Sequence, residues 1–135
     1  MAIAREEIDS KVQEAVAAAL GVDNEEATPD ATLMGDLGAE SIDLLDILFR
    51  IERSTRVKIQ AADLAAHIQG GIPDEEFGDA NGIITDKGMA QLKQAMPQIN
   101  PDELRGNLQA EKVITLFTVK NLADMVAERA EAGAG

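Results

Sequence analysis

The chain has 135 residues, of which 45% are hydrophobic, and its net charge is −13. This length is typical of a single domain with a modest core, so we treat residues 1–135 as one domain. The acidic balance argues against nucleic acid or an anionic membrane as a partner and favours basic patches on other proteins. Because the chain has no cysteine, disulfides, zinc–thiolate sites and thiol nucleophiles are excluded.

No apolar run approaches the length of a transmembrane helix, and charged residues follow Met1 where a signal peptide would be hydrophobic. We therefore expect a cytoplasmic protein with no membrane span, and a monomer. The first predicted helix covers residues 2–20 and ends at Gly21, a natural left-handed stop. Its apolar positions recur at intervals of four: Ile8, Val12, Val16 and Leu20.

A polar loop over residues 22–35 leads to the central predicted helix, residues 41–54. On this helix Asp43, Asp46 and Arg50 fall on one narrow stripe, while apolar residues fill an arc of roughly 220° at 100° per residue. A helix that apolar is expected to be covered on more than one side, as the central helix of a small bundle. Ser41 stands at its start, near the middle of the apolar arc.

Residues 60–116 differ in character. Short helices are predicted for 61–68, for the segment after a cap at Thr85 or Asp86 through Met96, and for 101–108 after the cap Asn100. Thr118 is expected to cap the last helix. The tail, residues 131–135, consists mostly of small residues and is expected to fray. The fold class is therefore all-α.

The stretch Asp36-Leu37-Gly38-Ala39-Glu40-Ser41-Ile42-Asp43 resembles the phosphopantetheine attachment motif of acyl carrier proteins. The residues around Gly21 and Ala31 resemble the first loop of that family, and Phe117 to Val126 resembles its last helix. This resemblance implies a four-helix carrier bundle built from residues 1–59 and 117–130. Residues 60–116 are then a helical insertion, since the family usually has a short loop and helix there.

The resemblance implies that a phosphopantetheinyl transferase attaches 4′-phosphopantetheine covalently to Ser41. Acyl groups then travel as thioesters on the thiol of this arm, in a fatty-acid, polyketide or specialised lipid pathway. Acyl-loading and acyl-processing enzymes would dock through basic patches. The resemblance assigns Glu40, Asp43 and Asp46 to this docking, although the two aspartates could equally form an ordinary solvated face.

Ser41 has a structural alternative, because serine before an apolar helix is commonly an N-cap. The function of the whole chain also has an alternative: it could be an unmodified acidic helical adaptor that keeps the carrier fold and only docks partners. We do not expect an enzyme, since no paired nucleophile and base is visible. We also expect no metal site, since His67 is the single histidine.

Two functions are open for residues 60–116. The segment is rich in Ile, Leu and Met, which pack flexibly, and it contains few aromatic residues. It could therefore enlarge the apolar pocket of the carrier for a long or unusual acyl group. Alternatively, it could be a docking platform for one partner that touches no cargo.

Overall fold

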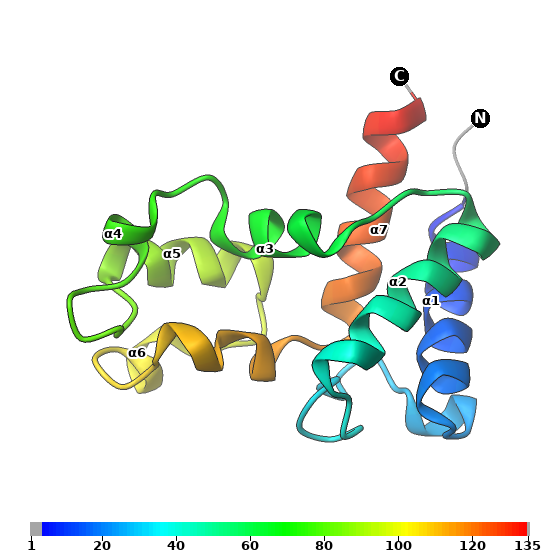
Figure 1. Ribbon diagram of the computed structural model, residues 1–135, viewed down its shortest axis with the longest axis horizontal. Helices are drawn as coiled ribbons and strands as arrows, with labels where there is room; N and C mark the ends of the chain where they lie inside the picture. Colours follow the sequence, from blue (N-terminus) through cyan, green and yellow to red (C-terminus); the bar gives the residue numbers. More distant parts are fainter. Residues whose placement is uncertain (1–3, 135) are drawn as a thin grey trace.

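The computed structural model describes residues 4–134, and these form two halves joined side by side (Figure 1). One half contains the long helices α1, α2 and α7, and the other contains the short helices α4, α5 and α6, with α3 between the two halves. The α-helices are α1 (Arg5–Leu20), α2 (Ser41–Thr55), α3 (Ala61–Gln69), α4 (Asp74–Phe77), α5 (Asp86–Ala95), α6 (Pro101–Leu104) and α7 (Val119–Ala134); the 3-10 helices are η1 (Asn24–Glu26) and η2 (Ala110–Leu116).

The half that contains α1, α2 and α7, which we call the carrier half, has a tightly packed aliphatic core. Val12 and Val16 of α1, Ile47 and Ile51 of α2, and Val126 of α7 are all fully buried. Phe117, just before α7, is fully buried as well. Burying side chains of this size stabilises each by about 1.5–3 kcal/mol relative to exposure, so the core needs no disulfide.

The other half, which we call the outer half, comprises α4, α5, α6 and η2 and has its own apolar centre. Met89 and Leu92 of α5 and Met96 after it are fully buried. Gly88 lies where α5 meets α4: a Cβ atom there would come within 2.5 Å of the carbonyl oxygen of Phe77. Only glycine therefore allows this approach, and the short helix α4 is held directly against the start of α5.

Backbone hydrogen bonds connect the loop before α2 to the start of α7. Leu33 N–H donates to the Phe117 carbonyl at 3.0 Å, and Val119 N–H donates to the Ala31 carbonyl at 3.0 Å. Lys120 N–H donates to the Pro29 carbonyl at 2.9 Å. The start of α7, where the chain returns from the outer half, is thus fastened to the loop that leads to Ser41.

The all-α prediction is confirmed, since no extended strands form within residues 4–134, only isolated bridges. The predicted caps are also present: Thr85 Oγ1 accepts from Gly88 N–H at 3.0 Å, and Thr118 Oγ1 accepts from Asn121 N–H at 3.1 Å. α6 ends at Leu104, before the predicted 108. In the same described range, no helix combines the length and hydrophobicity needed to span a bilayer.

The helix boundaries differ from the predicted ones in three places. The sequence did not predict α4 or η2, because each is shorter than the window of about 11–18 residues in which hydrophobic periodicity identifies a helix. α7 continues through Ala134, into the tail that was expected to fray, and Gly135 lies outside the described residues. The start of the first predicted helix, residues 2 and 3, also lies outside them, and α1 begins at Arg5.

Helix α2 was expected to be covered on more than one side, and only part of its apolar arc is buried. Ile47, Leu48 and Ile51 are buried, but three large apolar side chains on the same helix face solvent. These are Ile42, Leu45 and Phe49, whose exposed fractions are 71%, 55% and 57%. Helix α2 therefore has an unburied apolar side that the hydrophobic pattern alone did not distinguish from its buried side.

Candidate functional site

Ser41 is the first residue of α2, and its side chain is exposed. The N-cap is the preceding residue, Glu40, in an extended conformation. Asp43 Oδ2 accepts from the Glu40 N–H at 2.8 Å, which is the interaction that a carboxylate at the third helical position makes in a capping box. The alternative that Ser41 serves as the N-cap is therefore wrong, and its hydroxyl does not cap α2.

The loop before α2 is held in shape by its own side chains. Thr32 N–H donates to Asp36 Oδ2 at 3.0 Å, and Asp36 N–H donates to Thr32 Oγ1 at 2.8 Å. Gly38 follows with φ 71°, in the left-handed region that favours glycine, and a Cβ there would meet open space. Ala39 is buried and donates to the Leu33 carbonyl at 2.8 Å. These contacts fix the loop so that Ser41 lies exposed at the start of α2.

The start of α2 suits a phosphate group attached to Ser41. The backbone N–H groups at the first positions of an α-helix have no intrahelical partner, and the helix dipole is positive there. The first intrahelical N–H bonds in α2 are those of Asp43 and Leu44 to the Glu40 carbonyl. The amides of Ser41 and Ile42 precede them and can face an anion. The residues present therefore fit a phosphodiester at Ser41.

The three carboxylates suggested for docking are in different situations. Glu40 is exposed beside Ser41. Asp43 is partly buried and engaged by the Glu40 N–H, so it has a structural function whatever else it does. Asp46 accepts from Arg50 Nε at 3.0 Å, an ion pair between residues at i and i+4 on α2.

Ile42, Leu45 and Phe49, which we call the exposed stripe, run along α2 from the residue after Ser41. The guanidinium of Arg53 lies 5.7 Å from the centre of the Phe49 ring. Contiguous exposed apolar side chains rimmed by charges are typical of protein–protein contact sites. The spacing of the three residues was visible in the sequence, but only burial distinguishes them from core residues.

His67 lies on α3 and faces α7, where its Nδ1 is 3.4 Å from a carboxylate oxygen of Glu128. Among residues 4–134, no group of three His, Cys, Asp or Glu side chains is arranged to hold a metal ion.

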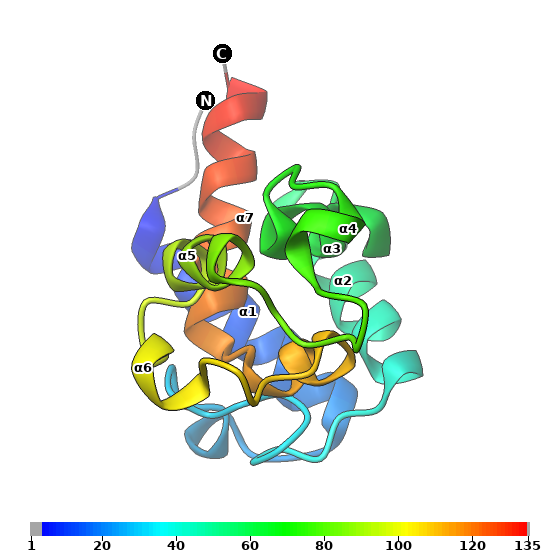
Figure 2. The ribbon, with the colours of Figure 1, turned by 90° about the vertical axis from the view of Figure 1, so that its left-hand side faces the viewer.

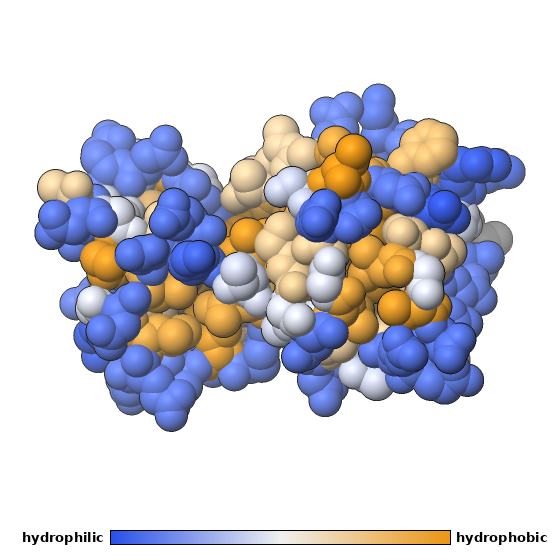
Figure 3. Space-filling model, turned by 60° about the horizontal axis from the view of Figure 1, so that its bottom comes forward, coloured by the Kyte–Doolittle hydropathy of each residue, from blue (hydrophilic) through white to orange (hydrophobic). Residues whose placement is uncertain are grey.

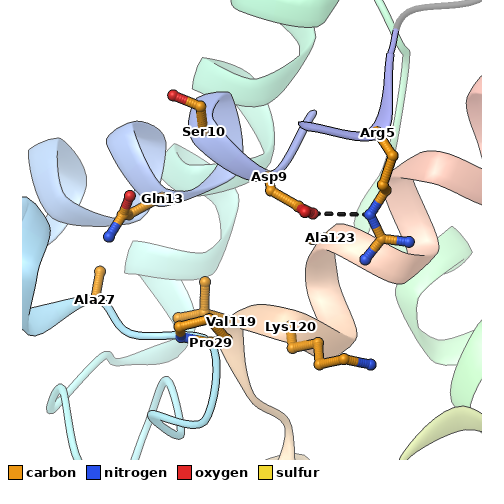
Figure 4. A pocket seen from close by; sticks show the side chains of 9 residues that line it. All are labelled: Arg5, Asp9, Ser10, Gln13, Ala27, Pro29, Val119, Lys120 and Ala123. Carbon is orange, nitrogen blue, oxygen red and sulfur yellow. Dashed lines mark hydrogen bonds and ion pairs between the residues drawn. The ribbon is translucent and has the colours of Figure 1, made fainter. Parts of the chain in front are cut away.

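A separate hollow of about 380 Å³ lies between α1 and the start of α7 (Figure 4). Arg5 there is paired with Asp9 at 2.8 Å and also with Asp124, and these carboxylates raise the pKa of its guanidinium. The charge of Arg5 in this hollow is thus already neutralised by its neighbours.

The fold and the site together define a helical carrier domain with a serine presented at the start of its second helix. The family described as the phosphopantetheine attachment site matches residues 10–68, a range that includes α3 except for its last residue, Gln69. The acyl carrier protein of Thermotoga maritima is 47% identical over 60 residues, covering 44% of this chain and 74% of the relative.

Two further acyl carrier proteins are also similar to part of this chain. The acyl carrier protein of Rubrobacter xylanophilus is 44% identical over 55 residues, covering 41% of this chain and 68% of its own length. The acyl carrier protein of Guillardia theta is 35% identical over 69 residues, covering 50% of this chain and 85% of its own length. No solved structure matches the chain.

The chain belongs to the acyl carrier protein family. Its members are carriers and not enzymes, and they hold 4′-phosphopantetheine covalently, so both of these expectations are confirmed. The alternative of an unmodified adaptor is thereby disfavoured. Each of these three relatives matches at most half of this chain, and the family match ends at Ile68, so α4, α5, α6 and η2 lie beyond it.

Proposed function

We propose that this protein carries acyl intermediates in the cytoplasm on a 4′-phosphopantetheine arm attached to Ser41, in a fatty-acid, polyketide or specialised lipid pathway. The observation that carries the proposal is the position of Ser41: exposed, first in α2, and not used as the N-cap. It also stands within the stretch Asp36–Asp43 that resembles the attachment motif.

The arm supplies a thiol that binds acyl groups as thioesters, and the chain itself contains no competing thiol. The residues of the chain have three tasks: Gly38 leaves the approach to Ser41 open, the free amides at the start of α2 favour the phosphate charge, and the Thr32–Asp36 pair holds the loop. None of these tasks requires the protein to change the cargo.

The docking surface in this proposal begins at Glu40 and follows α2. Basic groups on a transferase or an acyl-processing enzyme would meet Glu40, Asp43 and Asp46, while apolar groups would cover the exposed stripe. Contact between apolar surfaces would supply most of the affinity, and charge would set orientation and association rate. Arg50 and Arg53 make the far end of this surface basic, which favours partners with a matching acidic group there.

The proposal is tested by intact-mass measurement after co-expression with a broad-specificity phosphopantetheinyl transferase. We expect the mass of the native chain to rise by one phosphopantetheine group. Ser41→Ala should abolish the increase and leave helical content unchanged, because Glu40 caps α2. Ser54→Ala, which changes the other serine of α2, is the matched control and should be modified in full. Modification that persisted in Ser41→Ala would refute the assignment.

A further inference from the structure

An apolar groove lies at the junction of the two halves, between α3, α4 and η2. Its volume is about 290 Å³, close to the lower end of the roughly 300–1,000 Å³ range of small-molecule pockets. In Figure 2 the segment that contains η2 lies below α3 and α4, and the groove lies between these elements. Figure 3 shows hydrophobic side chains gathered across the middle of one face, inside a margin of hydrophilic ones.

The groove begins one helical turn from Ser41. Leu44 of α2 is among its lining residues, and it follows Ser41 by three positions. Residues three apart in an α-helix lie on the same face, so Ser41 and Leu44 point to the same side of α2. An arm attached to the Ser41 oxygen therefore starts within one helical turn of the groove, and also of Leu45 in the exposed stripe.

The outer half supplies one wall of this groove. Phe77 of α4 and Val113 and Ile114 of η2 line it opposite Leu64 and Ile68 of α3. The residues from α4 and η2 lie beyond the part of the chain that matches the carrier family. Without the outer half, α3 would leave its apolar side open to solvent on this face.

The chemistry of the lining distinguishes the groove from the exposed stripe. None of its lining residues carries a charge, although charged residues make up 27% of the chain. The stripe, in contrast, is bordered by Asp46, Arg50 and Arg53. A wall without charges favours a hydrocarbon chain, whereas a rim of charges favours a protein surface.

Small side chains keep the groove open. Ala61 and Ala65 of α3 and Ala110 of η2 line it, and all three are exposed. A large side chain at any of them would occupy the space directly. Because these alanines are at the surface, such a substitution tests occupancy of the groove without a large cost to the fold.

We propose that this groove receives the acyl chain of the thioester, with α4 and η2 forming the wall that lets a longer chain be covered. The proposal rests on attachment of the arm at Ser41. It selects the first of the two functions considered for residues 60–116, a sheath for the cargo, over a docking platform that touches no cargo.

In the test, a phosphopantetheinyl transferase transfers the acyl-phosphopantetheine group of acyl-coenzyme A compounds, with short to long straight chains, to the apo protein and releases adenosine 3′,5′-bisphosphate. Intact mass confirms each product. We expect the melting temperature to rise with chain length by about 1–3 °C per added methylene until the groove is filled. The methyl NMR signals of Ile68, Val113 and Ile114 should shift progressively over the same series.

The variant Ala65→Phe fills the groove and should remove both dependences on chain length. Ala66→Phe is the matched control: the neighbouring residue is also exposed, lies on the same helix and does not line the groove, so both dependences should remain. Successful loading with no dependence on chain length, or an equal dependence in both variants, would overturn the groove proposal. Failure to load any acyl group would instead count against attachment at Ser41.

Discussion

Gln98 and Asn121 exchange two amide hydrogen bonds across the junction of the two halves. Asn121 Nδ2 donates to Gln98 Oε1 at 3.0 Å, and Gln98 Nε2 donates to Asn121 Oδ1 at 2.8 Å. The same Asn121 oxygen accepts from the Thr118 N–H at 3.0 Å. One buried amide thus both caps α7 and connects it to the loop between α5 and α6.

Asn121→Ala should destabilise the protein, because it leaves the buried Thr118 N–H without its acceptor and removes both bonds to Gln98. An unsatisfied buried donor costs about 1–3 kcal/mol, and we expect the free energy of unfolding in urea to fall by that amount. Gln94→Ala, an exposed glutamine on α5, is the control and should change it little. Equal stability of Asn121→Ala and the native protein would contradict this account of the junction.

Replacing Asp43 and replacing Asp46 should have different effects on the stability of the protein. Asp43→Ala removes the acceptor for the Glu40 N–H, so we expect it to lower stability by about 0.5–2 kcal/mol, as the loss of a cap does. Asp46→Ala breaks only an exposed ion pair with Arg50, worth a few tenths of a kcal/mol. Thermal denaturation measures both. If both carboxylates also dock partners, each variant should slow modification by the transferase under conditions where it is fully folded.

Arg56→Gly should stabilise the protein. Arg56 is the C-cap of α2 with φ 64°, and it is the single residue other than glycine with positive φ among residues 4–134. A left-handed conformation costs a residue with a side chain roughly 1–2 kcal/mol relative to glycine. We therefore expect the urea midpoint to rise. Arg53→Gly, within the last turns of α2, is the control and should lower it, since glycine inside a helix costs about 1 kcal/mol.

Charge reversal at Arg50 and Arg53 should broaden partner recognition. The two arginines interrupt the acidic surface that follows Ser41, and Arg50 also neutralises Asp46. With both changed to Glu, we expect faster reaction with a general fatty-acid enzyme that docks carriers through a basic patch, and a rate that falls more steeply with salt. As the control, Lys11→Glu on α1 combined with Lys87→Glu on α5 changes the net charge by the same amount. The same gain in that control, or none in either, would remove local electrostatics as the cause.

The sequence predicted the parts of the fold that depend on local signals. Thr85 and Thr118 were recognised as caps because a hydroxyl before an apolar period has a direct structural purpose. Helix α2 was predicted almost to the residue. η2 was not predicted, since its apolar residues Val113 and Ile114 have their function in a groove whose other side lies some fifty residues earlier in the chain.

The site was predicted less completely than the fold. Ser41 could be named from the motif, but the sequence did not show that Glu40 is the N-cap and that Asp43 accepts from its N–H. The sequence pattern did not separate the exposed stripe from the core, because Ile42 and Leu45 are of the same residue types as the buried Ile47 and Leu48. Which apolar side chains meet another helix depends on tertiary contacts that periodicity does not contain.

The backbone bonds from Leu33 to Phe117 and from Val119 to Ala31 have a consequence for how such a chain can change over evolution. They hold the start of α7 against the loop before Ser41, while α3 is joined to α2 by a short extended connection. Both attachment points of the intervening segment are therefore anchored to the carrier half. Residues could be gained or lost between Gly70 and Leu116 while Ser41 keeps its place, so cargo size can be adjusted by insertion and deletion without redesigning the attachment site.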